Sequence, residues 1–113
     1  MEKTINIAGI DVNFKTSGAI PKRYKMQFGR DFFKDLLALG VSKIEGDDID
    51  AETMASINLD VFFDIAWTMA KTADPKIPDP MTWLDGFESF PIMEILPELQ
   101  DMISATISTT KKK

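Results

Sequence analysis

The sequence contains neither cysteine nor histidine. Without cysteine the chain forms no disulfide and offers no thiolate to a metal ion or to nucleophilic catalysis, so a disulfide-stabilised extracellular module is excluded and a reducing cytoplasm is expected. Without histidine it lacks the commonest general base and the commonest ligand of transition metals. Both absences weigh against an enzyme.

Long apolar runs are missing as well. No window approaches the roughly 20 consecutive apolar residues that a membrane-spanning helix needs. Residues 1–15 lack the apolar stretch and the small-residue cleavage site of a signal peptide. We therefore expect a soluble protein that stays where it is synthesised.

Positive charge is in the minority, because 13 lysines and arginines face 18 acidic residues, for a formal net charge of −5. A protein that binds duplex nucleic acid needs a basic face that neutralises phosphates. The residues that can build one here are a short run, Lys22, Arg23, Lys25 and Arg30, and the lysines at 111–113. We therefore regard a small nucleic-acid-binding regulator as a weak functional hypothesis.

The composition of the 113 residues, 44% hydrophobic and 27% charged, is that of one soluble globular domain. We expect an α+β, mostly helical fold in which an N-terminal β-hairpin packs on a bundle of about four to five helices. The domain is predicted to cover residues 1–108, with the hairpin at 4–15 and the helical part at 17–107. A disordered basic tail is predicted at 109–113.

Alternating apolar and polar residues predict the hairpin, and Gly9 suits its turn because glycine tolerates a positive φ. A spacing of four between apolar residues predicts a first helix that Thr16 or Ser17 caps and Gly29 ends. Asp31 is predicted to cap a second, short helix over residues 32–39.

The longest predicted helix covers residues 51–71 and begins at the cap Asp50. It should end before Pro75, because the residue that precedes a proline disfavours the α conformation. Its broad apolar surface suits a central helix that is contacted on more than one side. This surface comprises Met54, Ile57, Val61, Phe62, Ile65, Ala66, Trp67 and Met69.

Two further helices are predicted near the C-terminus. Asp79 and Pro80 begin a short helix that ends at Gly86, and the last helix covers residues 92–107. Pro97 either kinks this last helix or marks its true start. The apolar face of the last helix is formed by Ile92, Ile95, Leu96, Leu99, Ile103 and Ile107.

No catalytic, cofactor-binding or metal-binding residue is predicted. The acidic run at 46–52 lacks the glycine and glutamate positions of an EF-hand loop, so we interpret it as helix capping. The pairs Asp60–Asp64 and Glu94–Glu98 have the one-turn spacing that is common on solvated helix faces. We therefore predict a protein that is not an enzyme and requires no cofactor.

Large apolar side chains around residues 81–93 form the candidate site. Trp83, Phe87 and Phe90 lie in a short segment that cannot bury three rings by itself, so the rings either dock on the body of the domain or meet a partner. The methionines either fill the core or provide an adaptable surface for apolar helices. The predicted partner-binding residues are Phe63, Trp83, Phe87 and Met93.

Four segments, followed in their order along the chain, carry a resemblance to a known family. They are residues 5–15 (INIAGIDVNFK), 21–36 (PKRYKMQFGRDFFKDL), 62–71 (FFDIAWTMAK, followed by Ala73-Asp74-Pro75) and 83–87 (WLDGF). Together they resemble the tail assembly chaperones of long-tailed bacteriophages and of prophages of Gram-positive bacteria. The resemblance covers nearly the full chain and consists of packing patterns without a catalytic signature.

The resemblance implies a non-catalytic role in the host cytoplasm. Such chaperones bind the tape measure protein, a long and mostly helical chain, and keep it soluble until tail tube subunits polymerise around it. The resemblance implies absence from the mature virion, a homo-oligomer that opens or exchanges for its client, and possible contact with the tail tube protein. The alternative is a structural tail component, a connector or tube-associated subunit, that is retained in the virion.

In many phages of the family that the chain resembles, a ribosomal frameshift near the end of the gene also makes a longer form of the chaperone. The lysines at 111–113 are consistent with an A-rich slippery run in the gene. This hypothesis fails if the DNA shows no such run and no overlapping reading frame.

Overall fold

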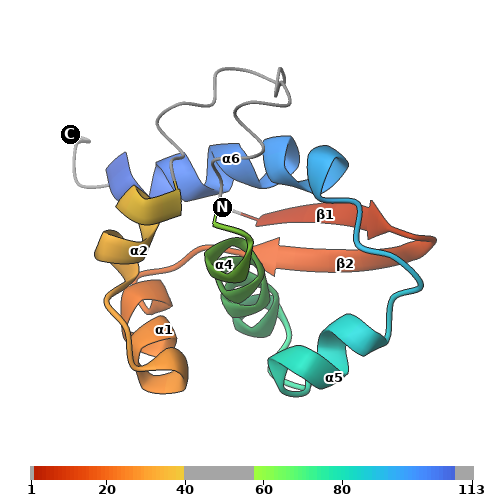
Figure 1. Ribbon diagram of the computed structural model, residues 1–113, viewed down its shortest axis with the longest axis horizontal. Helices are drawn as coiled ribbons and strands as arrows, with labels where there is room; N and C mark the ends of the chain where they lie inside the picture. Colours follow the sequence, from red (N-terminus) through yellow and green to blue (C-terminus); the bar gives the residue numbers. More distant parts are fainter. Residues whose placement is uncertain (1, 40–57, 109–113) are drawn as a thin grey trace.

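Residues 2–39 and 58–108, which the computed structural model describes, form an antiparallel β-hairpin and five helices (Figure 1). This arrangement confirms the predicted α+β, mostly helical fold. None of the described helices is long and apolar enough to span a membrane. The elements are β1 (Glu2–Ile7), β2 (Ile10–Lys15), α1 (Ile20–Phe28), α2 (Phe32–Leu39), α4 (Leu59–Ala73), α5 (Pro80–Asp85) and α6 (Ile92–Ser108).

The hairpin closes through a two-residue turn, since Ile7 pairs directly with Ile10. Ala8 and Gly9 both have positive φ, 52° and 89°, as a turn that matches the twist of the strands requires. The Asn6 side chain supports the turn by accepting a hydrogen bond from the Gly9 N–H at 3.1 Å. One face of the hairpin is buried, as predicted, through Ile5, Ile7, Val12 and Phe14.

The beginning of α1 differs from the prediction. Ala19 occupies the N-cap position without a side-chain hydrogen bond, so the predicted cap by Thr16 or Ser17 is wrong. The Ser17 hydroxyl instead accepts a hydrogen bond from the Ala19 N–H, one turn ahead of the helix. Pro21 reduces the need for a cap, because proline removes one of the backbone donors that the first turn leaves unpaired.

The other predicted boundaries of the two short helices are confirmed. Gly29 ends α1 in the left-handed conformation, with φ of 74°, which costs glycine no steric strain. The Asp31 carboxylate accepts a hydrogen bond from the Lys34 N–H at 2.9 Å and thereby caps α2.

Helix α4 begins later than predicted. Asn58 has an extended backbone, and its side-chain oxygen accepts a hydrogen bond from the Val61 N–H at 3.3 Å. An uninterrupted helix from residue 51 is therefore wrong, because the short amide side chain of Asn58 satisfies a first-turn donor and starts a helix here. The Asp50 cap, the acidic run at 46–52 and the tail at 109–113 lie outside the described residues. The predicted end of the helix is confirmed, since Asp74 is extended.

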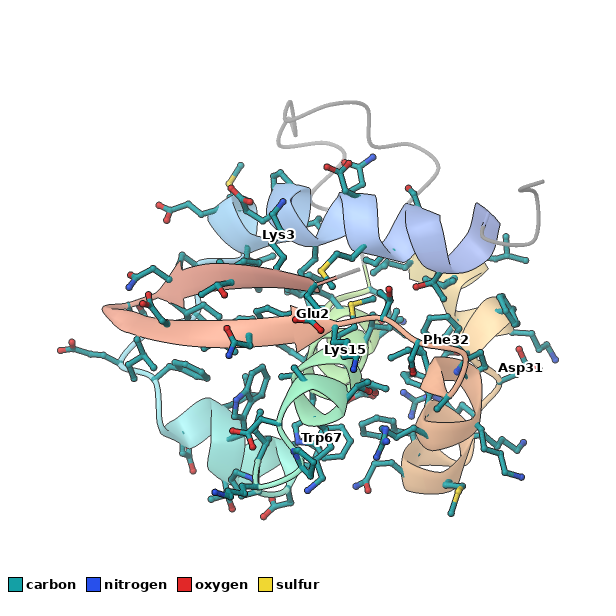
Figure 2. All side chains as sticks on the ribbon, turned by 180° about the vertical axis from the view of Figure 1, so that it is seen from behind. Glu2, Lys3, Lys15, Asp31, Phe32 and Trp67 are labelled. Carbon is teal, nitrogen blue, oxygen red and sulfur yellow. The ribbon has the colours of Figure 1, made fainter. Side chains whose placement is uncertain are left out.

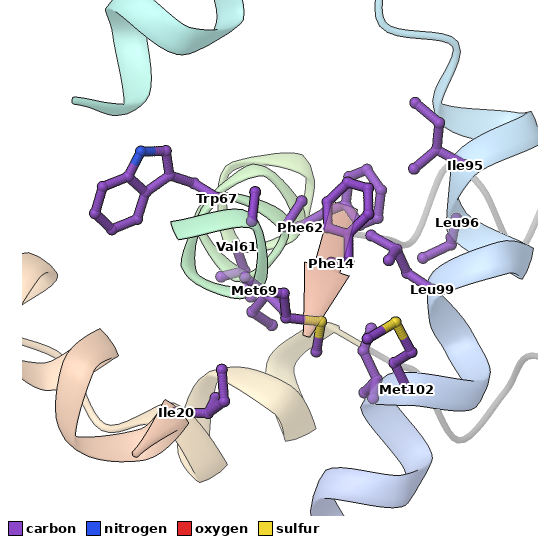
Figure 3. Close-up of a cluster of buried hydrophobic side chains, with 14 of the residues drawn as sticks. Phe14, Ile20, Val61, Phe62, Trp67, Met69, Ile95, Leu96, Leu99 and Met102 are labelled. Atoms are coloured by element: carbon purple, nitrogen blue, oxygen red, sulfur yellow. The ribbon is translucent and has the colours of Figure 1, made fainter. Parts of the chain in front are cut away.

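Helix α4 is the centre of the fold, as its broad apolar surface predicts. It contacts β2, α1, α2 and α5, while α6 packs on β1 (Figure 1). In Figure 3 the ring of Phe14 lies between α4 and the apolar face of α6. The core of α4 consists of Val61, Phe62, Ile65, Ala66, Trp67, Met69 and Ala70.

Helix α6 runs from Ile92 through Pro97, so the alternative that the helix starts at Pro97 is excluded. Its buried face includes Leu96 and Leu99, while the side chain of Ile107 is outside the described residues. Lys3 joins β1 to this helix, because its ammonium group lies 3.0 Å from the Glu98 carboxylate and donates to the Glu98 carbonyl (Figure 2).

Candidate interaction surface

Five aromatic rings from α4, α5 and the segment that follows α5 form one cluster, with Phe90 at its centre. The Phe90 centroid lies 5.5 Å from Phe63, 5.7 Å from Phe87 and 5.8 Å from Trp83, in edge-to-face geometry. Phe62 is the fifth ring, 6.3 Å away. Edge-to-face pairs at such distances add stability beyond the area that they bury.

The cluster brings together three of the four predicted partner-binding residues. Trp83 is buried in the core, and Phe63 and Phe87 are half-buried against it, so the rings dock on the body of the domain as the first interpretation predicted. The fourth predicted residue, Met93, is 55% exposed at the start of α6. Phe90, which links the rings, was not among the predicted residues, although its spacing from Phe87 was visible in the sequence.

Hydrogen bonds hold the proline-rich segment between α4 and α5, residues 74–79, against α4. The indole N–H of Trp67 donates to the Pro78 carbonyl at 2.8 Å, and the Lys71 ammonium group donates to the carbonyls of Pro75 and Ile77, each at 2.7 Å. Asp79 caps α5 as predicted, accepting from the Thr82 N–H. The bonds from Thr82 lower the pKa of Asp79. These contacts fix the start of α5, which lines one side of a groove opposite the hairpin.

A surface groove of about 340 Å³, here called the aromatic groove, lies between β2, the proline-rich segment and α5. Trp83 and Phe87 line it, whereas Phe63 and Met93 do not. The four predicted residues therefore do not form one surface. The other apolar residues of the aromatic groove are Ile10, Val12, Ile77 and Pro78, and its polar residues are Asp11, Asn13, Asp74 and Thr82.

Strand β2 contributes backbone groups to this groove. Strand β1 pairs with one edge of β2, and the other edge has no strand partner among the described residues. The residues that flank a two-residue turn form a hydrogen-bonded pair, so alternation directs the backbone N–H and C=O groups of Asp11 and Asn13 to that other edge. The groove thus combines apolar side chains with backbone hydrogen-bonding groups, as peptide-binding grooves do.

The methionines divide between the core and the surface. Met69 and Met102 are buried, whereas Met26, Met81 and Met93 are 76%, 66% and 55% exposed. The core interpretation is confirmed for Met69 and Met102, and the adaptable surface stays a prediction for the three exposed methionines. Met54 lies outside the described residues.

A polar network joins α1, α2 and α4. The Arg30 guanidinium pairs with Asp35 at 2.8 Å and also with Asp64, while the Tyr24 hydroxyl donates to Asp35 at 2.6 Å. Burial opposes ionisation of Asp35, but the bonds from Tyr24 and Arg30 outweigh it and lower its pKa. Burial raises the pKa of Tyr24, and its bond to Asp35 raises that pKa further.

The network corrects two predictions. Asp64 was expected on a solvated face with Asp60, yet its side chain is only 19% exposed and binds Arg30. Burial raises the pKa of Asp64 more than the pairing with Arg30 lowers it. Arg30 was a candidate phosphate-binding residue, but two carboxylates already neutralise it, which weakens the nucleic-acid hypothesis. The sequence carried no signal for the pairing of Arg30 with Asp64, because the two residues are 34 positions apart.

Among residues 2–39 and 58–108, no three acidic side chains gather in a way that could hold a metal ion. The predicted lack of an enzymatic activity and of a cofactor stays a prediction. Comparison of the chain with protein-family models, with curated proteins and with solved structures gives no match.

Proposed function

We propose that the protein is a bacteriophage tail assembly chaperone that binds the tape measure protein in the host cytoplasm and keeps it soluble during tail morphogenesis. One observation carries this proposal beyond the sequence resemblance. Trp83 and Phe87, two of the predicted partner-binding residues, line an apolar groove at the molecular surface. Such a groove suits a client whose helices expose apolar stripes before assembly, because exposed stripes aggregate unless they are covered.

The size of the aromatic groove favours weak, reversible binding. A volume of about 340 Å³ accommodates a few apolar side chains and not the face of a whole helix. Burying one such side chain contributes about 1.5–3 kcal/mol, so two anchors contribute at most about 6 kcal/mol. This corresponds to a Kd no tighter than about 0.04 mM before the costs of association. Weak sites suit a chaperone that must release its client when tube subunits polymerise. The net charge of −5 helps to keep the complex soluble.

Co-expression with the tape measure protein of the same phage or prophage tests the proposal. The chaperone is expected to move the client from the pellet to the supernatant of the lysate. Ile10→Glu places a charge at the rim of the aromatic groove on a side chain that is already 44% exposed. The fold should therefore survive this substitution while the client returns to the pellet.

Leu37→Glu is the matched control, because Leu37 is 84% exposed and does not line the aromatic groove. It should leave the solubility of the client unchanged. If the wild-type chain itself does not alter the solubility of the client, the proposal is wrong.

The proposal also places the chain outside the mature particle. Mass spectrometry of purified virions should then detect the tape measure and tube proteins and not this chain. Stoichiometric detection would favour the alternative, a connector or tube-associated subunit.

A further inference from the structure

A second groove lies between α1 and α4, with a volume of about 390 Å³. We call it the basic groove. Its cationic residues are Lys22, Arg23 and Lys71, and no acidic residue lines it. This is a local excess of positive charge on a chain whose formal net charge is −5.

Two of the cations differ in how the fold holds them. Lys71 is held through its bonds to the carbonyls of Pro75 and Ile77. The Nε atom of Arg23 is buried, and no hydrogen-bond partner for it exists in the described part of the chain. A buried donor without a partner is costly, so the Arg23 side chain would gain a charge-assisted hydrogen bond by shifting towards a carboxylate bound in the groove.

Apolar groups accompany the charges. Met26 also lines the groove and is 76% exposed. Trp67 lines it too, and its ring centroid lies 5.7 Å from that of Phe28. Figure 3 shows Trp67 pointing away from the side of α4 that faces Phe14 and α6. The basic groove is therefore a separate site, on another side of α4 from the Phe14 core.

We propose that the basic groove binds an acidic segment of another polypeptide, with carboxylates on Lys22 and Arg23 and an apolar side chain on the exposed Met26. Charge complementarity selects such a segment. A nucleic acid fits less well, because Trp67 is only 4% exposed and offers no free ring face on which a base could stack. This inference does not depend on the identity of the client of the aromatic groove.

The two tryptophans of the chain give each groove its own reporter, since Trp67 lines the basic groove and Trp83 the aromatic groove. In ¹H–¹⁵N NMR spectra of the full chain, a synthetic peptide of repeated Glu-Glu-Leu should shift the indole signal of Trp67. The signal of Trp83 should stay in place. Because the attraction is between partly exposed charges, the apparent Kd should rise with added salt.

The double variant Lys22→Glu/Arg23→Glu should weaken binding by about tenfold or more, since it turns attraction into repulsion. Lys34→Glu on α2 is the matched control, because Lys34 is exposed and does not line the groove. Circular dichroism of both variants confirms that the fold is retained.

Four outcomes would overturn the inference. The first three are an unshifted Trp67 signal at millimolar peptide, an equal loss of binding in Lys34→Glu, and a stronger response to a single-stranded oligonucleotide than to the peptide. The third of these would assign the groove to nucleic acid. If the folded double variant binds the peptide like the wild type, the cations have no role and the proposal also fails.

Discussion

At the scale of single residues, four side chains determine where a helix begins or how elements pack together. Asn58 and Asp79 each begin a helix by accepting one backbone hydrogen bond. Phe90 contacts four rings from α4, α5 and the segment after α5. Arg30 joins α1 to α2 and α4 through Asp35 and Asp64. The first two residues determine where a helix begins, and Phe90 and Arg30 determine how elements meet.

Phe90→Ala should lower the free energy of unfolding by about 2–3 kcal/mol, somewhat less than for a fully buried phenylalanine, because Phe90 is half-buried. Urea denaturation followed by circular dichroism measures the change. Phe33→Ala is the control, since Phe33 is 48% exposed and its removal should cost much less. Equal losses in the two variants would contradict a central role of Phe90.

Tyr24 is the single tyrosine of the chain, so its ionisation can be followed directly by absorbance. Burial and the bond to Asp35 raise its pKa in the folded state, whereas the pKa in the unfolded chain is about 10. A raised pKa contributes stability that is complete below the unfolded value and is lost as the pH rises through the folded value. Stability should therefore fall above about pH 10 more steeply in the wild type than in Tyr24→Phe.

Urea denaturation at a series of pH values measures the two slopes, and tyrosinate absorbance of the folded protein should appear only well above pH 10. The comparison uses slopes because Tyr24→Phe also removes the hydrogen bond to Asp35 at every pH. Parallel pH profiles would show that Tyr24 ionises as easily in the folded chain as in the unfolded chain.

At the scale of elements, the two-residue turn of the hairpin requires positive φ at both positions, and alanine is not the best residue for the first of them. Ala8 adopts a positive φ of 52°, which costs a residue with a side chain roughly 1 kcal/mol. The aromatic groove depends on this hairpin, because four consecutive residues of β2 line it, from Ile10 to Asn13. A better turn should thus stabilise the wall of the groove as well as the fold.

Ala8→Asn should raise the free energy of unfolding by about 0.5–1 kcal/mol, because asparagine followed by glycine is the preferred pair for this turn. Thermal denaturation measures the gain. Gly9→Ala should have the opposite effect, since Gly9 has a φ of 89° that alanine adopts only with strain. A loss of stability in Ala8→Asn would show that the turn is held by contacts beyond its own backbone.

At the scale of the whole molecule, two grooves of different chemistry lie on different elements, the aromatic groove on β2 and α5 and the basic groove on α1 and α4. The aromatic groove is mostly apolar, while the basic groove has three cations on a chain of net negative charge. If the chaperone proposal is right, self-association and client binding use the same apolar surface, so that the two compete.

Sedimentation velocity over a range of concentrations tests this competition. The wild type should form a homo-oligomer that dissociates on dilution, and Ile10→Glu should shift the equilibrium towards the monomer. Leu37→Glu should leave the equilibrium unchanged. A monomer at all concentrations would contradict the proposed homo-oligomer. Client binding would then be tested by the solubility experiment alone.

The sequence alone determined the features that arise from neighbouring residues. The Asp31 and Asp79 caps, the left-handed Gly29 and the turn at Gly9 were all predictable, because each depends on bonds within about one helical turn or one strand turn. The buried faces of α4 and α6 were predictable for the same reason, since periodicity identifies the apolar side of a helix.

Only the tertiary structure decided which of these faces meet. Periodicity does not say that Phe90 joins the rings around it, that Asp64 leaves the solvent to bind Arg30, or that Trp67 and Trp83 belong to different grooves. The contact of Phe90 with Phe63 and the pairing of Asp64 with Arg30 link elements that are far apart in the chain. These interactions stabilise the protein only after folding has brought the partners together, so a pattern of neighbouring residues does not predict them.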